Sequence, residues 1–270
     1  RPRCPRPPPP PEGAGRRGLR SVTPDPLPID AVLPEVLMAL RKRGLCVLQA
    51  PPGAGKTTRV PLAILGAGLT PGRILILEPR RLAARAAAER MAATLDQPPS
   101  GTVGYRMRGE SRIGPTTRIE VVTEGVFTRM IQSDPDLPGV GAVIFDEFHE
   151  RAIVSDLGLA LTLDARAALR PDILVLVMSA TLDAAPVAAL MDDAPVVTSD
   201  GRSFPVTLHW LGRPLQRDAR WDVAMADLVR QAYGETAGGL LAFLPGEGDI
   251  RRVEARRLAR ELGADAGLSP

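Results

Sequence analysis

The stretch APPGAGKT at residues 50–57 follows the apolar run LCVLQ at residues 45–49 and precedes a predicted helix over residues 58–66. A strand, a glycine-rich loop and a helix N-terminus form the context that a phosphate-binding loop requires. The backbone N–H groups of such a loop surround phosphate oxygens, and the helix N-terminus adds a partial positive charge. Lys56 can then reach the outer phosphates, and the Thr57 hydroxyl can bind Mg²⁺. The stretch therefore predicts a triphosphate site.

An ordinary glycine–proline turn that happens to contain a lysine is the alternative interpretation, and Ala50 does stand where the strict pattern has glycine. The composition weighs against it, because Lys42 and Lys56 are the only lysines among 34 basic residues. In a chain so biased toward arginine, a lysine in this loop indicates that arginine does not serve there.

Length and composition allow one large domain or two small ones, because the chain has 270 residues of which 44% are hydrophobic. The net charge of +3 is concentrated in residues 1–20, which carry six arginines and one acid. The remaining 250 residues hold 28 basic and 30 acidic side chains. Bulk charge therefore does not indicate nucleic-acid binding by the folded part, and any such site must be local.

The arginine- and proline-rich residues 1–28 are expected to form a disordered arm. No apolar run reaches the length of a membrane span, and no apolar segment follows the basic N-terminus as it does in a secretory signal. Cys4 and Cys46 provide no disulfide framework, which fits a reducing compartment. We therefore predict a cytoplasmic protein without a membrane partner.

On both sides of the loop, apolar runs alternate with helical patterns. Strands are predicted at residues 74–77, 103–108, 118–122, 140–145 and 173–178, and helices at residues 30–43, 82–95, 125–131 and 156–169. Apolar runs separated by helices indicate an α/β fold in which a parallel sheet carries helices on both faces. Such sheets bind ligands beyond the carboxyl ends of their strands.

The last part of the chain resembles the opening of a second α/β unit. An extended segment is predicted for Phe204–Trp210, a helix for Val223–Tyr233, a strand for Leu240–Leu244 and a second helix for Asp249–Leu262. About fifty residues cannot complete a domain of this kind.

Two adjacent acids, Asp146 and Glu147, follow the apolar strand at residues 140–145. Their burial would be costly without a cation or another partner. Beside a phosphate loop, the first acid can hold Mg²⁺ and the second can deprotonate a water aimed at the γ-phosphate. A solvated helix cap is the alternative for an isolated pair. His149 and the triplet Ser179–Thr181 are weak signals alone, because serine and threonine are frequent caps.

Taken together, these motifs resemble the DEAH/DExH branch of superfamily-two helicases, which are P-loop NTPases with RecA-like domains. The matching segments are residues 53–58 for motif I, 79–84 for motif Ia, 123–125 for motif Ib, 146–149 for motif II, 179–181 for motif III and 241–246 for motif IV. Phe148, the prolines before Gly53 and the run FLPG at residues 243–246 are most similar to bacterial HrpB-type helicases. The resemblance covers residues 30–262.

The resemblance implies ATP and Mg²⁺ as ligands. The triphosphate would be bound by Gly53, Ala54, Gly55, Lys56, Thr57 and Thr58, with the adenine stacked on Arg90. The metal would be held by Thr57 and Asp146. Glu147 would be the catalytic base, and His149 with Ser179 and Thr181 would couple the nucleotide state to strand separation. The nucleic-acid backbone, expected from the resemblance alone to be single-stranded RNA, would meet Arg80, Arg81 and Thr123.

One family motif is missing. The run Gln-x-x-Gly-Arg-x-Gly-Arg, whose arginines reach the γ-phosphate from the second domain of relatives, does not occur in the chain. We therefore expect residues 29–202 to form the helicase ATP-binding domain and residues 203–270 a linker with an incomplete second RecA-like domain. Such a truncated chain would bind nucleotide weakly, hydrolyse it poorly and fail to translocate.

Two other kinds of function remain open at this point: another P-loop enzyme (a GTPase or a small-molecule kinase), or a non-enzymatic module. A GTPase is disfavoured because its guanine motif needs asparagine, which the chain lacks entirely, and a kinase would leave the residues after the strands at 140–145 and 173–178 unexplained. A non-enzymatic module would bind RNA without nucleotide, unaffected by Lys56→Ala. The oligomeric state is not determined by these patterns.

Overall fold

The computed structural model describes residues 26–180, 184–201, 206–212, 220–235 and 238–265. Contacts divide the chain into two units, Arg1–Phe204 and Pro205–Pro270. Within the described residues, no helix is both long and apolar enough to cross a membrane.

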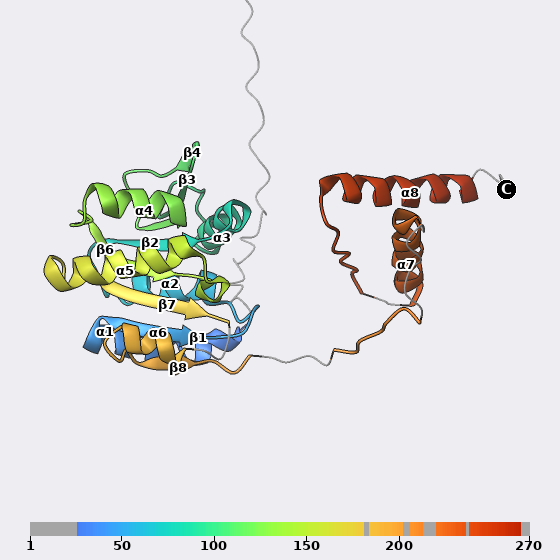
Figure 1. Cartoon of the computed structure of the whole chain (residues 1–270). Helices are drawn as coiled ribbons and strands as arrows, with labels where there is room; N and C mark the ends of the chain where they lie inside the picture. Colours follow the sequence, from blue (N-terminus) through green and yellow to red (C-terminus); the bar gives the residue numbers. More distant parts are fainter. Residues whose placement is uncertain (1–25, 181–183, 202–205, 213–219, 236–237, 266–270) are drawn as a thin grey trace, which may run out of the picture. The chain divides into compact units, whose positions relative to one another are not determined.

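An eight-stranded sheet forms the centre of the first unit (Figure 1). Its strand order is β4-β3-β5-β2-β6-β7-β1-β8, and every neighbouring pair is parallel except β3 with β4. The strands are β1 (Leu45–Gln49), β2 (Arg73–Glu78), β3 (Val103–Met107), β4 (Glu110–Arg112), β5 (Ile119–Thr123), β6 (Val140–Phe145), β7 (Leu174–Ser179) and β8 (Val196–Thr198).

Helices cover both faces of this sheet and bury two separate cores (Figure 1). The helical elements are η1 (Pro28–Ala31), α1 (Leu33–Arg43), α2 (Lys56–Gly66), α3 (Arg81–Thr94), α4 (Glu124–Ser133), η2 (Phe148–Glu150), α5 (Ile153–Ala168) and α6 (Ala185–Leu190). In β1, Cys46 and Leu48 face the core of α1, α2 and α3, whereas Leu45 and Val47 face that of α4, α5 and α6. The predicted α/β fold, with a RecA-like parallel sheet and helices on both faces, is confirmed.

Four short elements were not predicted from the sequence: β4, β8, α6 and the three-residue η2. Strand β4 is antiparallel and mostly exposed, so its residues show no apolar pattern. Strand β8 is three residues long and has a single buried position. Helix α6 is only six residues long. Segments this short carry too few residues to establish a period of 2.0 or 3.6.

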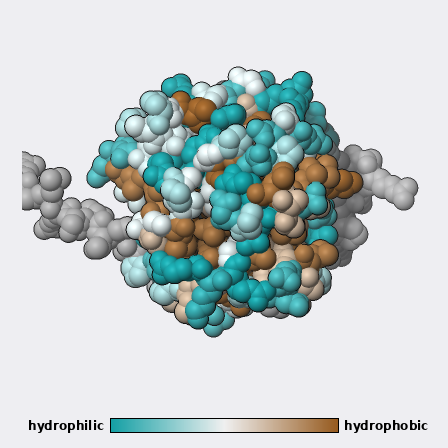
Figure 2. Space-filling model, turned by 90° about the vertical axis from the view of Figure 1, so that its left-hand side faces the viewer, coloured by the Kyte–Doolittle hydropathy of each residue, from teal (hydrophilic) through white to brown (hydrophobic). Residues whose placement is uncertain are grey.

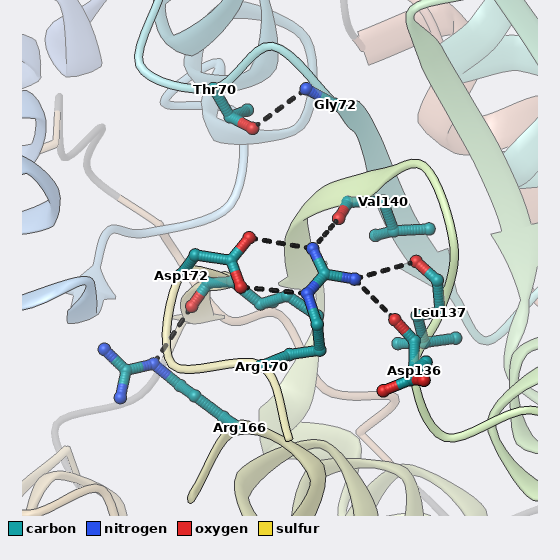
Figure 3. A network of polar contacts seen from close by, with 9 residues as sticks. Thr70, Gly72, Asp136, Leu137, Val140, Arg166, Arg170 and Asp172 are labelled. Atoms are coloured by element: carbon teal, nitrogen blue, oxygen red, sulfur yellow. Dashed lines mark hydrogen bonds and ion pairs between the residues drawn. The ribbon is translucent and has the colours of Figure 1, made fainter.

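The edge at which the strands begin is held by arginine side chains that bind loop carbonyl groups (Figure 3). Arg170 donates to the carbonyls of Asp136, Leu137 and Val140, and it forms a two-pronged contact with the Asp172 carboxylate at 2.8 and 2.9 Å. The loops before β6 and β7 are thereby joined. On the face where the strands begin, hydrophilic residues are interspersed with hydrophobic ones (Figure 2).

The second unit contains two packed helices, α7 (Trp221–Glu235) and α8 (Glu247–Asp265). An ion pair joins them, because Arg256 Nε lies 3.1 Å from Asp222 Oδ2. The strand predicted at Leu240–Leu244 is wrong: the segment has no regular structure, and Leu241 and Phe243 are exposed. A strand needs a neighbour to pair its backbone, and the described residues of this unit contain no other strand. Residues 206–210 are likewise irregular, and the rest of the predicted extended segment lies outside the described residues.

We expect Arg170→Lys to lower the free energy of unfolding by about 1–3 kcal/mol. Lysine keeps the charge but cannot make the two-pronged contact with Asp172 while also serving the loop carbonyls. Urea unfolding followed by circular dichroism measures the effect. Arg41→Lys, on the exposed side of α1, is the matched control and should change stability by less than about 0.5 kcal/mol. Equal losses in the two variants would contradict this account.

Candidate nucleotide site

The parallel pairing brings the predicted site residues to one edge of the sheet. Gln49 pairs with Ser179 across β1 and β7, and Glu78 pairs with Thr123 across β2 and β5. Strand β6 lies between β7 and β2 and ends directly before Asp146. Five strand ends therefore lie side by side at the edge where ligands bind in open α/β sheets.

The loop after β1 has the backbone geometry that a phosphate-binding loop needs. Gly53 and Gly55 adopt left-handed φ angles of 78° and 95°, which residues with a side chain rarely accept. Helix α2 begins directly afterwards at Lys56, and the Gly55 carbonyl accepts a 2.9 Å hydrogen bond from the Arg59 N–H. The loop and the helix N-terminus are thus continuous, as the sequence predicted.

Two contacts join this loop to the acids after β6. Lys56 Nζ lies 3.0 Å from Glu147 Oε1, and the lysine side chain is only 4% exposed. The Thr57 hydroxyl donates a 2.5 Å hydrogen bond to Asp146 Oδ2. These contacts therefore join residues that follow two different strands, β1 and β6, into one cluster. The sequence associated the two groups only through their motifs.

The acid pair itself is held in a tight turn. Glu147 has a left-handed φ of 50°, and its N–H donates to Asp146 Oδ1 at 2.8 Å. Burial raises the pKa of Asp146 to about 6, although the Thr57 hydroxyl and the Lys56 ammonium oppose the rise. A buried carboxylate beside a second acid is a group that a cation stabilises.

We call residues 146–150 the acid turn. His149 connects this turn to the end of β7. Its Nδ1 accepts a 3.2 Å hydrogen bond from the Ala180 N–H and lies 3.4 Å from Glu147 Oε2. Ser179 is buried, and its carbonyl accepts from the Ala50 N–H at 3.0 Å. Thr181 lies outside the described residues.

The sequence analysis missed a third acid at this edge. Glu78 ends β2 and is only 4% exposed. Burial, with further contributions from Asp146 and Glu147, raises its pKa to about 8. The available signal was a carboxylate directly after the apolar run ILIL at residues 74–77.

The predicted nucleic-acid residues lie at the two strand ends beyond β6. Arg80 is exposed and forms an ion pair with Glu150 in η2, while Arg81 is the exposed first residue of α3. Thr123 ends β5 and directly precedes α4. Arg80 therefore contacts the acid turn through Glu150, whereas Thr123 follows β5, which is separated from β6 by β2.

Two other predicted ligands of the nucleotide are not part of this cluster of contacts. The Thr58 hydroxyl is 3.5 Å from the Gly55 carbonyl oxygen and half-buried. Arg90 is exposed on α3, nine residues after the helix begins and so about 13 Å along its axis. Helix α3 packs against α2, and the role of Arg90 toward adenine stays a prediction.

The oxygen atoms of Thr57 and Asp146 are suited to Mg²⁺. The described residues contain no group of three or more histidine, cysteine, aspartate or glutamate side chains arranged for a metal. Mg²⁺ usually takes one or two protein ligands and completes its shell with water and substrate phosphates. A converging hydroxyl and buried carboxylate beside a phosphate loop fit that pattern.

Comparison with known proteins agrees with this geometry. Residues 30–190 match the family model described as DEAD/DEAH box helicase, so the chain belongs to that family. It is 52% identical to the ATP-dependent RNA helicase HrpB of Escherichia coli K12 over 244 residues, which are 90% of this chain and 30% of that protein. It is 34% identical to the ATP-dependent RNA helicase HrpA of the same organism, covering 84% of this chain and 18% of that protein.

The fold comparison gives the same result. The crystal structure of the E. coli DEAH/RHA helicase HrpB superposes with a TM-score of 0.80 at 51% identity, covering 87% of this chain and 30% of that one. The predicted resemblance to DEAH/DExH helicases of the HrpB type is therefore confirmed. The chain spans about 30% or less of the length of these relatives.

We expect Glu78→Gln to change the pH dependence of stability. Between about pH 4.5 and pH 8 the folded protein retains a proton on Glu78 that the unfolded chain releases. The free energy of unfolding therefore falls as the pH rises through this window, by up to about 1.4 kcal/mol per unit. Glutamine removes this titration, so the variant should gain stability relative to wild type as the pH rises.

Urea unfolding at several pH values measures this difference. Glu89→Gln, on the exposed face of α3, is the control and should leave the wild-type slope unchanged. A wild-type slope retained in Glu78→Gln would contradict the assignment.

Proposed function

We propose that the first unit binds ATP with Mg²⁺ and serves as the ATP-binding domain of an RNA helicase of the DEAH/DExH type. The pair of contacts Lys56–Glu147 and Thr57–Asp146 carries this proposal. They bring a phosphate loop and an acid pair within hydrogen-bonding distance, and hydrolysis of a phosphoanhydride needs both.

Each residue of the cluster has a distinct task. The Lys56 ammonium would bind the outer phosphates, and a triphosphate would compete for it with the Glu147 carboxylate. Thr57 and Asp146 would hold Mg²⁺, which neutralises charge on the phosphate oxygens. Glu147, released from Lys56, would accept a proton from the attacking water as the bond between the γ-phosphorus and the bridging oxygen breaks. His149 would hold the acid turn against β7 through Ala180.

Two observations support a nucleic-acid partner. The relatives with which the chain aligns are named RNA helicases. Two exposed arginines follow β2, and one of them, Arg80, pairs with Glu150 in the acid turn. Arg80, Arg81 and Thr123 would contact the backbone of single-stranded RNA. RNA phosphate would compete with Glu150 for Arg80, so nucleic-acid binding would act directly on the turn that carries Glu147.

The chain alone is proposed to hydrolyse ATP slowly. The arginine-containing motif implied by the resemblance does not occur in these 270 residues, and an arginine finger contributes about 10³–10⁵-fold to the rate of GTPases. We therefore expect this chain to bind ATP even though it hydrolyses ATP slowly, so binding and hydrolysis can be measured separately in its variants.

We expect Glu147→Gln to retain affinity for a fluorescent ATP analogue and to lower hydrolysis by about 10²-fold or more, because the amide cannot accept the proton. Lys56→Ala should lose binding as well. Phosphate release with and without single-stranded RNA, beside equilibrium binding, tests both expectations. Strong RNA binding that is unaffected by nucleotide and by Lys56→Ala would instead favour an RNA-binding module. Failure of wild type to bind the analogue would refute the nucleotide site.

We expect Arg80→Ala to weaken RNA binding about equally for different sequences. The magnitude of the slope of log affinity against log salt concentration should fall by about one, which is the contribution of one phosphate contact. Affinity for the ATP analogue should stay unchanged, because Arg80 is outside the phosphate loop. Arg41→Ala, at the opposite end of the sheet on α1, is the matched control. An unchanged salt slope would contradict a contact between Arg80 and phosphate.

A further inference from the structure

A short segment before α1 lies directly against the phosphate loop. We call residues 27–30 the N-terminal strap; it includes the start of η1. Ile29 is fully buried in the same core as Ala54, and its N–H donates to the Ala54 carbonyl at 3.2 Å. The strap thus contacts the loop through both its backbone and a side chain, which none of the sequence motifs indicated.

The strap also fills the space beside the second loop glycine. A Cβ atom placed on Gly55 would lie 2.5 Å from Leu27 Cδ1 and 3.4 Å from Ile29 Cγ2. Gly55 is therefore needed for two reasons: its φ of 95° and the closeness of the strap. With Leu27 in place, the loop backbone cannot move toward the strap without displacing a packed side chain.

The strap is held on both sides. The Leu27 N–H donates to Asp30 Oδ2 at 2.9 Å, which closes the strap on itself. Asp30 Oδ1 lies 3.7 Å from Arg59 Nε in the first turns of α2. The strap therefore bridges the loop at Ala54 and the following helix at Arg59, and Gly55 lies between these two attachments.

We propose that the strap is a positioning element of the triphosphate site, with Leu27 and Ile29 as positioning residues. A loop with two glycines at positive φ has many conformations of similar energy, and packing one side of it selects the conformation that receives phosphates. The inference rests on the proposed nucleotide site. Because the strap contacts the loop backbone, its loss should weaken every ligand that binds through a phosphate chain.

The test compares Leu27→Ala, Leu27→Met and the control Leu161→Ala in the full 270-residue chain. Leu161 is also half-buried, but it packs on the other face of the sheet, against the second core. Hydrogen exchange of the backbone N–H groups of residues 50 and 53–58 is measured by mass spectrometry without nucleotide. Dissociation constants are then measured with Mg²⁺ for a fluorescent ATP analogue and, by competition, for inorganic tripolyphosphate.

We expect Leu27→Ala to speed exchange in the loop and to weaken both ligands by the same factor, about three- to tenfold, as the competent fraction of the loop falls. Leu27→Met, which keeps the apolar volume, should restore wild-type values. Leu161→Ala should lower the melting temperature without changing loop exchange or either affinity.

Two outcomes would overturn the inference: unchanged loop exchange in Leu27→Ala, or a loss confined to the ATP analogue, which would mean that the strap contacts the base. If wild type bound neither ligand, the proposed function would fail, and loop exchange would still decide whether the strap positions the loop.

Discussion

The parallel pairing of strands buried on both faces is the constraint on which this molecule depends. Because such strands must run in the same direction, their carboxyl ends meet at one edge, and helices on both faces leave that edge open. The phosphate loop, the acid pair and the strand-end arginines lie far apart along the chain. Their proximity follows from the order of strands, and at the opposite edge arginine side chains bind carbonyl groups at the start of β6 and before β7.

The strand order also determines how the chemistry is distributed. From β1 through β7 and β6 to β2 and β5, the edge presents a phosphate loop, a buried serine, an acid pair, an arginine pair and a threonine. Strand β6 is central, so the acids after it can contact the loop on one side and the strand-end arginines on the other. A turn of five residues makes both contacts, with Glu147 on Lys56 and Glu150 on Arg80.

Most of this arrangement could be predicted from the sequence, because long elements with a clear period determine the sheet. Strands β1 and β6 match their predicted bounds, and the apolar runs predicted the other long strands within one or two residues. The strand predicted at Leu240–Leu244 failed, since an apolar run shows only that burial is favourable and cannot supply a neighbour. In the site, the motifs identified Lys56 and Glu147, but they carried no information about contacts made outside them, such as those of Glu78 and Leu27.

The burial of Lys56 explains why the ion pair suits a nucleotide site. A buried ammonium is costly unless a negative group accompanies it, and here Glu147 provides that group at 3.0 Å. In the proposed site, phosphate oxygens would replace the carboxylate, so Lys56 would keep a negative partner and the exchange would cost little further desolvation. The carboxylate displaced from Lys56 is the group proposed as the base, and the left-handed backbone at Glu147 keeps it at the same turn. Binding of the triphosphate and release of the base would then be one event at one lysine.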